Sequence, residues 1–269
     1  MSHRARLYSS TALAAVLAAA AVPAAAADFG EAFGPSPGSQ PAVSAPNGKL
    51  DIRGGSQDGL GSFQATGSFS IPIDHAFGFQ ADGMIGSLGG EAVGAIGAHL
   101  FWRDPAAALL GVYADVGFNN SAAIGSIGRV GAEGELYLER LTLKALLGGQ
   151  FGDSSGFFDK VTLSYYPGDD LELYVGHRYL PGRGHSGAAG FEFLTGALAP
   201  ANVALFTEGQ VGENGYAAGY GGIRFYFGPE KSLIRRHRED DPTTHFDLFM
   251  SAASLALLGD GEGGAGQEF

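Results

Sequence analysis

The sequence contains no cysteine, which excludes a disulfide framework, a thiolate metal site and a cysteine nucleophile. Basic residues are also few, with 16 Lys and Arg against 28 Asp and Glu. Without Arg4 and Arg6, which lie in an N-terminal segment discussed below, 14 − 28 gives a net charge of −14. Such an acidic chain is not expected to bind nucleic acid. The seven histidines show no metal spacing such as H-x-x-x-H, so no metal ligands and no cofactor are predicted.

Long hydrophobic runs are missing too. After residue 27, no run reaches the ~18 apolar residues of a membrane-spanning helix. If this part of the chain crosses a membrane, it must therefore do so as a β-barrel. Glycine, by contrast, is abundant, with 45 residues that follow no collagen-like period. They are scattered through segments that otherwise alternate apolar and polar residues.

The first 27 residues have the features of a secretory signal peptide. Arg4 and Arg6 form a basic start, an apolar run from Thr11 follows, and Ala25-Ala26-Ala27 ends it before Asp28. A membrane anchor is the alternative, but the run is short and ends in small residues. We expect residues 1–27 to direct export to the periplasm, and residues 28–48, rich in Pro, Ser, Ala and Gly, to form a flexible leader.

Alternation with a period of two dominates the middle of the chain. In residues 130–139, for example, Val130, Ala132, Leu136 and Leu138 share one face, whereas Glu133, Glu135, Tyr137 and Glu139 share the other. The pattern predicts twelve strands, close in length to those that cross a bilayer. They lie near residues 49–55, 62–72, 77–86, 91–102, 108–118, 127–139, 141–151, 158–166, 171–179, 188–197, 202–211 and 216–227.

The predicted connections alternate between tight turns and somewhat longer loops rich in Gly, Ser and Asn. This is the rule in outer-membrane barrels, where the short turns face the periplasm and the longer loops face outward. Residues 49–228 are therefore predicted to form an all-β fold, a transmembrane antiparallel up-and-down barrel of twelve strands. A soluble β-sandwich is the alternative, because half-buried soluble strands alternate in the same way.

The signal peptide, the glycine-rich meander and the segment Gly219–Phe227 resemble Gram-negative outer-membrane β-barrel proteins of the porin-like superfamily. The resemblance covers about residues 49–228. It implies an outer-membrane location, outer-membrane lipid and the barrel-assembly machinery as partners, and small solutes as cargo, but no particular oligomeric state. In that family the closing strand usually ends the chain at an aromatic residue. Phe227 fits that role, yet 269 − 227 = 42 residues follow it here.

Strand parity also predicts which charged side chains face the lumen. The acidic set is Asp51, Asp82, Asp115, Glu133, Glu135, Glu139, Glu172, Glu192 and Glu208, and the basic set is Arg53, Arg129, Lys144, Arg178 and Arg224. This surplus of acids suggests a small passive channel with mild cation preference, because lumen charge tunes selectivity. Side chains in a twelve-strand barrel leave a gap of roughly 10 Å or less. Salt bridges that fill the lumen would instead give a non-conducting structural or interaction barrel.

Residues 229–269 do not continue the strand pattern, and three interpretations are open. They form a periplasmic tail that is partly helical, a plug that inserts Arg235, Arg236 and Arg238 among the acidic lumen residues, or a docking segment. The apolar stretch from Phe246 to Leu258 is too short to cross a membrane as a helix.

An enzyme is a less favoured possibility. Some outer-membrane barrels are lipid hydrolases, and one twelve-stranded phospholipase family relies on a His-x-Ser-Asn-type strand motif. The nearest match here, His185-Ser186-Gly187, lacks both the spacing and the asparagine. His177 lies one hairpin arm away, and no spacing indicates that it activates a serine. No catalytic residue is therefore predicted.

Overall fold

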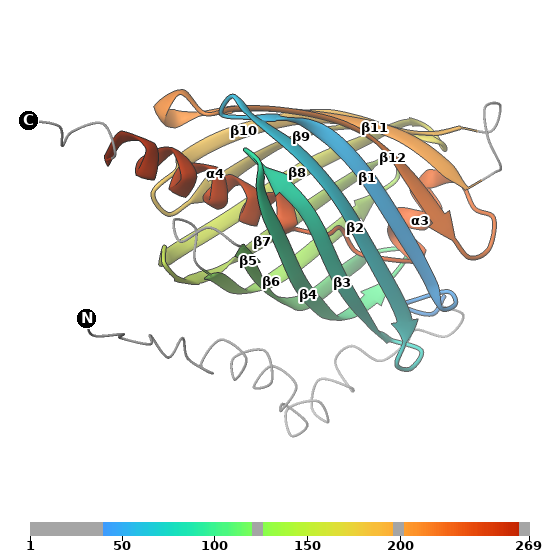
Figure 1. Cartoon of the computed structure of the whole chain (residues 1–269). Helices are drawn as coiled ribbons and strands as arrows, with labels where there is room; N and C mark the ends of the chain where they lie inside the picture. The colour runs from blue at the N-terminus through green and yellow to red at the C-terminus, as the bar shows by residue number, and fades with distance from the viewer. Residues whose placement is uncertain (1–39, 120–125, 196–201, 264–269) are drawn as a thin grey trace, which may run out of the picture. The chain divides into compact units, whose positions relative to one another are not determined.

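The computed structural model describes residues 40–119, 126–195 and 202–263 (Figure 1). Twelve antiparallel strands follow one another around a closed barrel, and β1 pairs with β12 to close it. The predicted twelve-strand, up-and-down barrel is therefore confirmed. The strands are β1 Asn47–Gln57, β2 Leu60–Pro72, β3 Phe77–Leu88, β4 Glu91–Asp104, β5 Ala108–Asn119, β6 Ser126–Leu138, β7 Leu141–Gly152, β8 Gly156–Gly168, β9 Leu171–Leu180, β10 Gly184–Thr195, β11 Val203–Gly212 and β12 Ala217–Phe227.

The barrel has two ends, which we name by their connections. The turn end carries residues 73–76, 105–107, 139–140 and 169–170 together with Asn47 and Phe227, and the loop end carries 58–59, 89–90, 153–155, 181–183 and 213–216. Several strands extend into the loops expected from the sequence. The β1–β2 loop is reduced to Asp58 and Gly59, with φ of 52° and 79°. Asp-Gly is a preferred pair for such tight hairpins, because both central residues adopt positive φ.

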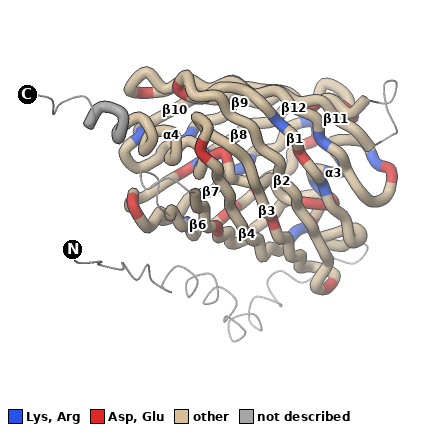
Figure 2. The backbone as a smooth tube through the Cα atoms, viewed as in Figure 1, with Lys and Arg blue, Asp and Glu red and all other residues tan. Residues whose placement is uncertain are grey.

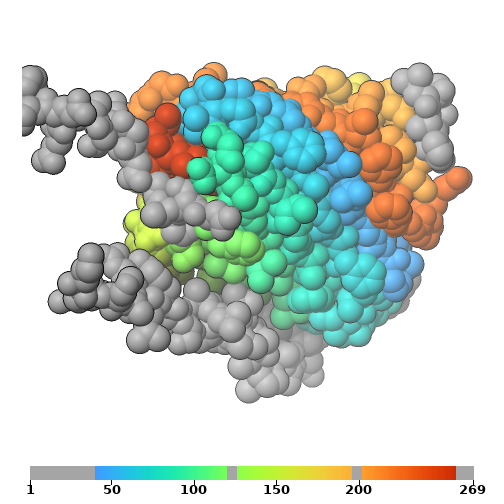
Figure 3. Space-filling model, viewed as in Figure 1, coloured from blue at the N-terminus to red at the C-terminus, as the bar shows by residue number. Residues whose placement is uncertain are grey.

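The strand alternation gives the barrel two faces of different character. Val130, Leu136 and Leu138 are 36%, 44% and 50% exposed on the outside, whereas Glu133 and Glu135 of the same strand are buried inside. Figure 3 shows one side of the wall as a continuous surface of packed side chains over the strands coloured blue to green. An apolar outside and a charged inside are the arrangement expected of a barrel in lipid, and the reverse of a soluble core.

Residues 228–263, the described part of the chain beyond β12, contribute no strand. They form α3 (Leu233–Glu239) and α4 (Phe246–Gly263), and a short 3-10 helix, η1 (Glu213–Gly215), precedes β12. Figure 1 shows α3 and α4 at opposite ends of the barrel. The predicted non-barrel tail is thus confirmed as a helical segment outside the strand ladder. Among the described residues, no helix is long and apolar enough to cross a membrane.

Candidate functional site: the barrel lumen

The charged residues predicted to face the lumen lie on the inner wall, with one exception. Asp51, Asp82, Asp115, Glu133, Glu135, Glu172, Glu192, Arg129 and Arg178 are buried there, while Arg53, Lys144, Glu208 and Arg224 are partly exposed in the lumen. Glu139 is the exception, because the strand ends at Leu138. Glu139 lies exposed in the β6–β7 turn with a φ of 40°.

Three further basic side chains face inward, and sequence parity did not single them out. Lys49 and Arg103 are 7% and 2% exposed, and the Lys160 side chain is 12% exposed. Leaving aside the first and last residue of each strand, the inner wall therefore carries eight acids and eight bases. The acids are Asp51, Asp82, Asp115, Glu133, Glu135, Glu172, Glu192 and Glu208, and the bases are Lys49, Arg53, Arg103, Arg129, Lys144, Lys160, Arg178 and Arg224. The predicted surplus of acidic residues is absent from these described wall positions. Figure 2 shows where Lys and Arg, and Asp and Glu, lie along the chain.

Many of these wall charges pair with one another. Arg129 makes two hydrogen bonds of 3.0 Å to Asp115, and Arg178 Nη2 donates to Glu208 at 2.9 Å. Arg224 of β12 pairs with Asp51 on the adjacent β1 and with Glu192 on β10, two strands away. Opposite charges on adjacent strands, or on strands one further apart, thus neutralise much of the field inside the barrel.

The segment between α3 and α4 passes through the lumen. Lys49 of β1 donates to the Pro242 carbonyl at 3.1 Å, and Lys144 of β7 donates to Thr243 Oγ1 at 3.1 Å. Gln80 of β3 also donates to the Pro242 carbonyl, at 3.3 Å. Because these strands lie in different parts of the wall, a segment that contacts all their inner side chains lies inside the barrel.

Asp241 of this segment and Asp247 in the first turn of α4 bind cations of the wall. Asp241 pairs with Lys49. The Asp247 carboxylate accepts hydrogen bonds from Lys160 at 3.0 and 3.1 Å and lies 3.1 Å from Arg178 Nη2. Asp247 is 8% exposed, so these charges interact away from bulk water and more strongly than a surface pair.

The first turns of α4 fill the lumen towards the loop end. Phe246, Phe249 and Met250 are at most 2% exposed and pack in one cluster with inner-wall residues of β3, β4 and β6: Met84, Leu88, Val93, Ala95 and Ile127. A Cβ atom on Gly117 of β5 would lie 2.1 Å from the Phe249 ring, so glycine there leaves room for the helix. These wall residues are apolar although they point into a charged lumen. Such a pattern in the sequence indicates that an apolar segment, here α4, packs inside the barrel.

Polar contacts hold α4 to the loops around it. Arg183, in the β9–β10 loop, donates to Asp58 Oδ2 at 2.7 Å and to Ser254 Oγ at 2.6 Å. Gln57 donates to the Met250 carbonyl and to Ser254 Oγ, both at 2.6 Å. Two loops that lie far apart in the sequence are thereby tied to the same face of α4.

At the turn end, α3 lies against the barrel. Leu233 is fully buried with Leu194, Ala204 and Tyr226. The described end of the predicted leader lies here as well, because Val43 packs in a cluster with Phe101, Leu109 and Tyr137, and Ser44 N donates to the Glu239 carbonyl at 2.9 Å. Side chains from both ends of the chain therefore cover this end of the lumen.

The three tail arginines do not reach the acidic lumen residues. Arg235 pairs with Glu239 of its own helix at 2.8 Å. Arg236 donates to Asn202 Oδ1 at 2.5 Å, and Arg238 donates to the Leu141 carbonyl at 2.9 Å. Arg236 and Arg238 fasten α3 to the turn end, while the contacts inside the lumen are made by Asp241, Thr243, His245 and Asp247 instead.

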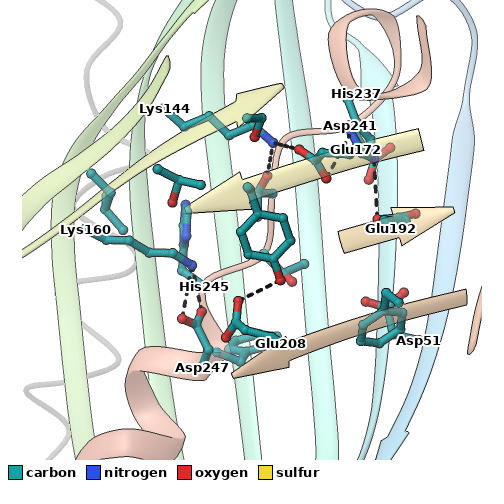
Figure 4. Close-up of a pocket in the computed structure, with 18 of the residues that line it drawn as sticks. Asp51, Lys144, Lys160, Glu172, Glu192, Glu208, His237, Asp241, His245 and Asp247 are labelled. Atoms are coloured by element: carbon teal, nitrogen blue, oxygen red, sulfur yellow. Dashed lines mark hydrogen bonds and ion pairs between the residues drawn. The ribbon is translucent and has the colours of Figure 1, made fainter. Parts of the chain in front are cut away.

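A cavity of about 140 Å³ remains between the threaded segment and one side of the wall. Figure 4 shows its charged lining, with Lys144 and Glu172 on one side and Asp247 with Lys160 on another. His237 of α3 also lines it, and burial lowers the pKa of His237 to about 3 although the Glu172 carboxylate acts in the opposite direction. The cavity is polar enough to hold water.

The histidine and serine considered for hydrolysis do not form a pair. His185 and Ser186 are consecutive in β10, so their side chains point to opposite faces of the wall. Ser186 is 7% exposed on the inner face, whereas the His185 ring contacts His177, with 2.9 Å between Nδ1 and Nε2. A serine nucleophile needs its base within hydrogen-bond reach, and this geometry does not supply it.

No protein-family model matches the sequence, and no curated protein matches it. Solved structures do match. The KdgM porin in complex with disordered oligogalacturonate has a TM-score of 0.54 at 11% identity, covering 67% of this chain and 99% of that chain. A second structure of the KdgM porin has a TM-score of 0.50 at 11% identity, with the same coverage. Likeness at this identity concerns the fold, and the chain has the fold of the outer-membrane β-barrel porins.

Proposed function

We propose that this protein is an outer-membrane channel for ions or small solutes that is closed by its own C-terminal segment. In this proposal the turn end faces the periplasm, as in barrels whose chain ends lie there. The lumen plug, which we define as residues 229–263, crosses the lumen from the turn end to the loop end. The outer side chains contact outer-membrane lipid, and the exposed Phe227 is available to the barrel-assembly machinery.

One observation carries this proposal. The inner wall is lined with charged side chains, and three of its cations bind a segment that is not part of the wall. Lys160 and Arg178 bind Asp247, and Lys49 binds Asp241. When the plug leaves, Asp241 and Asp247 leave with it, and water can hydrate the wall cations in their place. The wall is therefore compatible with a water-filled state. The fold shared with the KdgM porin also supports the proposal that this barrel is a channel.

The ion selectivity that we propose is weak. A mild cation preference followed from the predicted acidic surplus, but Lys49, Arg103 and Lys160 balance the acids of the wall. A lumen with paired charges of both signs exerts little net field on a passing ion. We therefore expect the open barrel to pass small cations and anions at similar rates, with any cation preference close to unity.

A non-conducting structural barrel is the second candidate, and the filled lumen favours it. Planar-bilayer recordings separate the two, using the full chain and a variant that lacks residues 229–269. Low conductance from the full chain and steady current from the truncated barrel support the plugged channel. Silence from both, with each sample shown to be folded by its heat-modifiable mobility on a gel, would leave the structural barrel as the better account.

A further inference from the structure

Three side chains with metal-ligating atoms meet where the lumen plug contacts the wall. His99 comes from β4, Glu133 from β6 and His245 from the linker just before α4. Their ligand atoms all lie within 4.8 Å of one another. His99 is fully buried, and Glu133 and His245 are 7% and 8% exposed. Residues separated by 34 and 112 positions are thus brought together by the fold, which is why spacing in the sequence indicated no metal site.

The distances are close to those of a tetrahedral metal site. His99 Nδ1 lies 2.9 Å from Glu133 Oε2, and His245 Nε2 lies 3.8 Å from the same oxygen. Ligand atoms at ~2.0–2.1 Å from a zinc ion are separated by roughly 3.3 Å. Since the ligand atoms all lie within 4.8 Å of one another, separations need to change by no more than about 1.5 Å for the three donors to share one ion. His245 lies in a linker and not in the wall, so its position is not fixed by strand pairing and it can move towards an ion.

The surroundings of His99 match those of a metal ligand. Its other nitrogen, Nε2, lies 2.9 Å from Asp82 Oδ2, and Gln80 donates to Asp82 Oδ1 at 2.8 Å. Histidines that bind metals usually donate their second N–H to a carboxylate, which fixes the ring and the tautomer. With Nε2–H bonded to Asp82, Nδ1 and the Glu133 carboxylate are two acceptors 2.9 Å apart, and a metal ion beside them would bind both.

His245 supplies an independent observation. Among the described residues its Nδ1 has no hydrogen-bond partner, although the side chain is nine-tenths buried. The ring is positioned by edge contact with Tyr113, at 5.0 Å between centroids, and lies 5.7 Å from the His99 ring. The atom that faces Glu133 is the other nitrogen, Nε2, which lies 3.8 Å from Glu133 Oε2, beyond hydrogen-bond distance.

Charge also favours a cation here. Asp82 and Glu133 flank His99, while the basic side chains Lys160 and Arg178 are bound to Asp247 and Arg129 is bound to Asp115. A proton on His99 would supply one positive charge, whereas a divalent ion would supply two and would also bind His245. The second three-residue group, Glu172, Glu192 and His237, is less suitable. Lys144 and Arg224 already neutralise its acids, and tyrosine hydroxyls occupy both nitrogens of His237.

We propose that His99, Glu133 and His245 form a binding site for a divalent first-row transition metal, with zinc as the representative ion. Two imidazoles and a carboxylate are a common zinc ligand set, and water from the adjacent cavity, which Glu133 and His245 line, completes the coordination. The ion joins β4 and β6 to the linker before α4. If the lumen plug closes a channel, as proposed above, the metal holds the channel closed.

Metal binding can be measured without conductance recordings. A failure to bind metal would therefore count against the metal site and leave the proposed channel untouched. Zinc is titrated calorimetrically into the full chain in detergent micelles, and Co²⁺ is added separately to record the visible absorption of tetrahedral cobalt. The reference background is the double variant His177→Ala/His185→Ala, because this exposed pair on the outer surface also offers two nitrogens. We expect one tightly bound ion per chain in that background, with a tetrahedral cobalt spectrum that zinc abolishes.

Variants identify the ligands. In the reference background, His245→Ala and Glu133→Gln should each weaken zinc binding at least 100-fold, and Asp82→Asn should weaken it roughly 10- to 100-fold. His237→Gln, in the other group, should bind zinc as the reference does. The proposal is overturned by absence of saturable binding, or by zinc affinity that is the same in the reference and in His245→Ala. In either case a protonated His99 between two carboxylates accounts for the cluster.

Discussion

Replacing Asp247 with alanine should release the lumen plug. The carboxylate receives two hydrogen bonds from Lys160, at 3.0 and 3.1 Å, and lies 3.1 Å from Arg178 Nη2. The Lys160 and Arg178 side chains are 12% and 3% exposed, so alanine would leave both cations without a partner in a space that holds little water. Withdrawal of the plug lets water enter and hydrate them, and this favours the open state.

The magnitude follows from the burial of these groups. Removing one member of a buried ion pair costs about 3–5 kcal/mol. Arg178 retains Glu208 at 2.9 Å, so the lower value applies. A loss of about 3 kcal/mol changes the equilibrium between docked and released plug roughly 100-fold. The open fraction in bilayer recordings should rise by up to that factor until it approaches that of the barrel lacking residues 229–269.

The matched control is Asp169→Ala at the turn end. Asp169 pairs with Arg140, but the two side chains are 61% and 50% exposed. A surface pair of this kind contributes about 0–1 kcal/mol, so the open fraction should change little. Two measurements on folded Asp247→Ala test this reasoning: the open fraction, and the rate at which trypsin cleaves the plug. If both equal those of the unmodified chain, Asp247 does not hold the plug in place.

Three other outcomes are expected. Gly117→Leu places side-chain atoms where the Phe249 ring lies, so it should raise conductance of the full chain but leave the truncated barrel unchanged. The pKa of His237 is lowered to about 3 by burial and should be near 6.5 in a released plug, so docking should weaken by about 2 kcal/mol between pH 8 and pH 5. Conductance should rise over that range in the unmodified chain and not in His237→Gln. Ile96→Arg, at a position 51% exposed on the outer wall, should destabilise the barrel in vesicles by about 2–4 kcal/mol in urea unfolding, whereas Ile96→Val should cost less than ~1.5 kcal/mol.

The barrel could be predicted from the sequence because its determinants are local. A period of two assigns each side chain to a face, and turn residues mark where the chain reverses, so neither requires knowledge of distant contacts. The inward direction of Asp115, Glu133 and Arg224 follows from parity alone. Glu139 was assigned wrongly because the strand ends one residue earlier, at Leu138, and parity has no meaning in a turn.

The path of the lumen plug could not be predicted in the same way. Its contacts join residues such as Lys49 and Asp241, which are almost two hundred positions apart, and no periodicity links them. The basic run of Arg235, Arg236 and Arg238 suggested insertion among acids, but long side chains on a short helix at the turn end find nearer partners. The relevant signal was the apolar residues Met84 and Ile127 at inward positions. Apolar side chains are unfavourable in a water-filled lumen, so they indicate an apolar partner inside the barrel.

The two halves of the plug interact with the wall by different physics, and this determines the resting state. Residues 240–247 make hydrogen bonds and ion pairs that water replaces when the plug leaves, so the intact pairs contribute little net free energy. Removing one partner is different, because Asp247→Ala leaves two buried cations in the docked state. Phe249 and Met250 of α4 are fully buried against Met84, Leu88 and Val93, and water cannot replace those contacts. Each such side chain contributes about 1.5–3 kcal/mol when buried. A continuous path opens only while α4 is displaced, and the polar and apolar contacts together set how often that happens. The full chain should accordingly rest closed, with brief openings that become more frequent when either set of contacts is weakened, as in Asp247→Ala or Gly117→Leu.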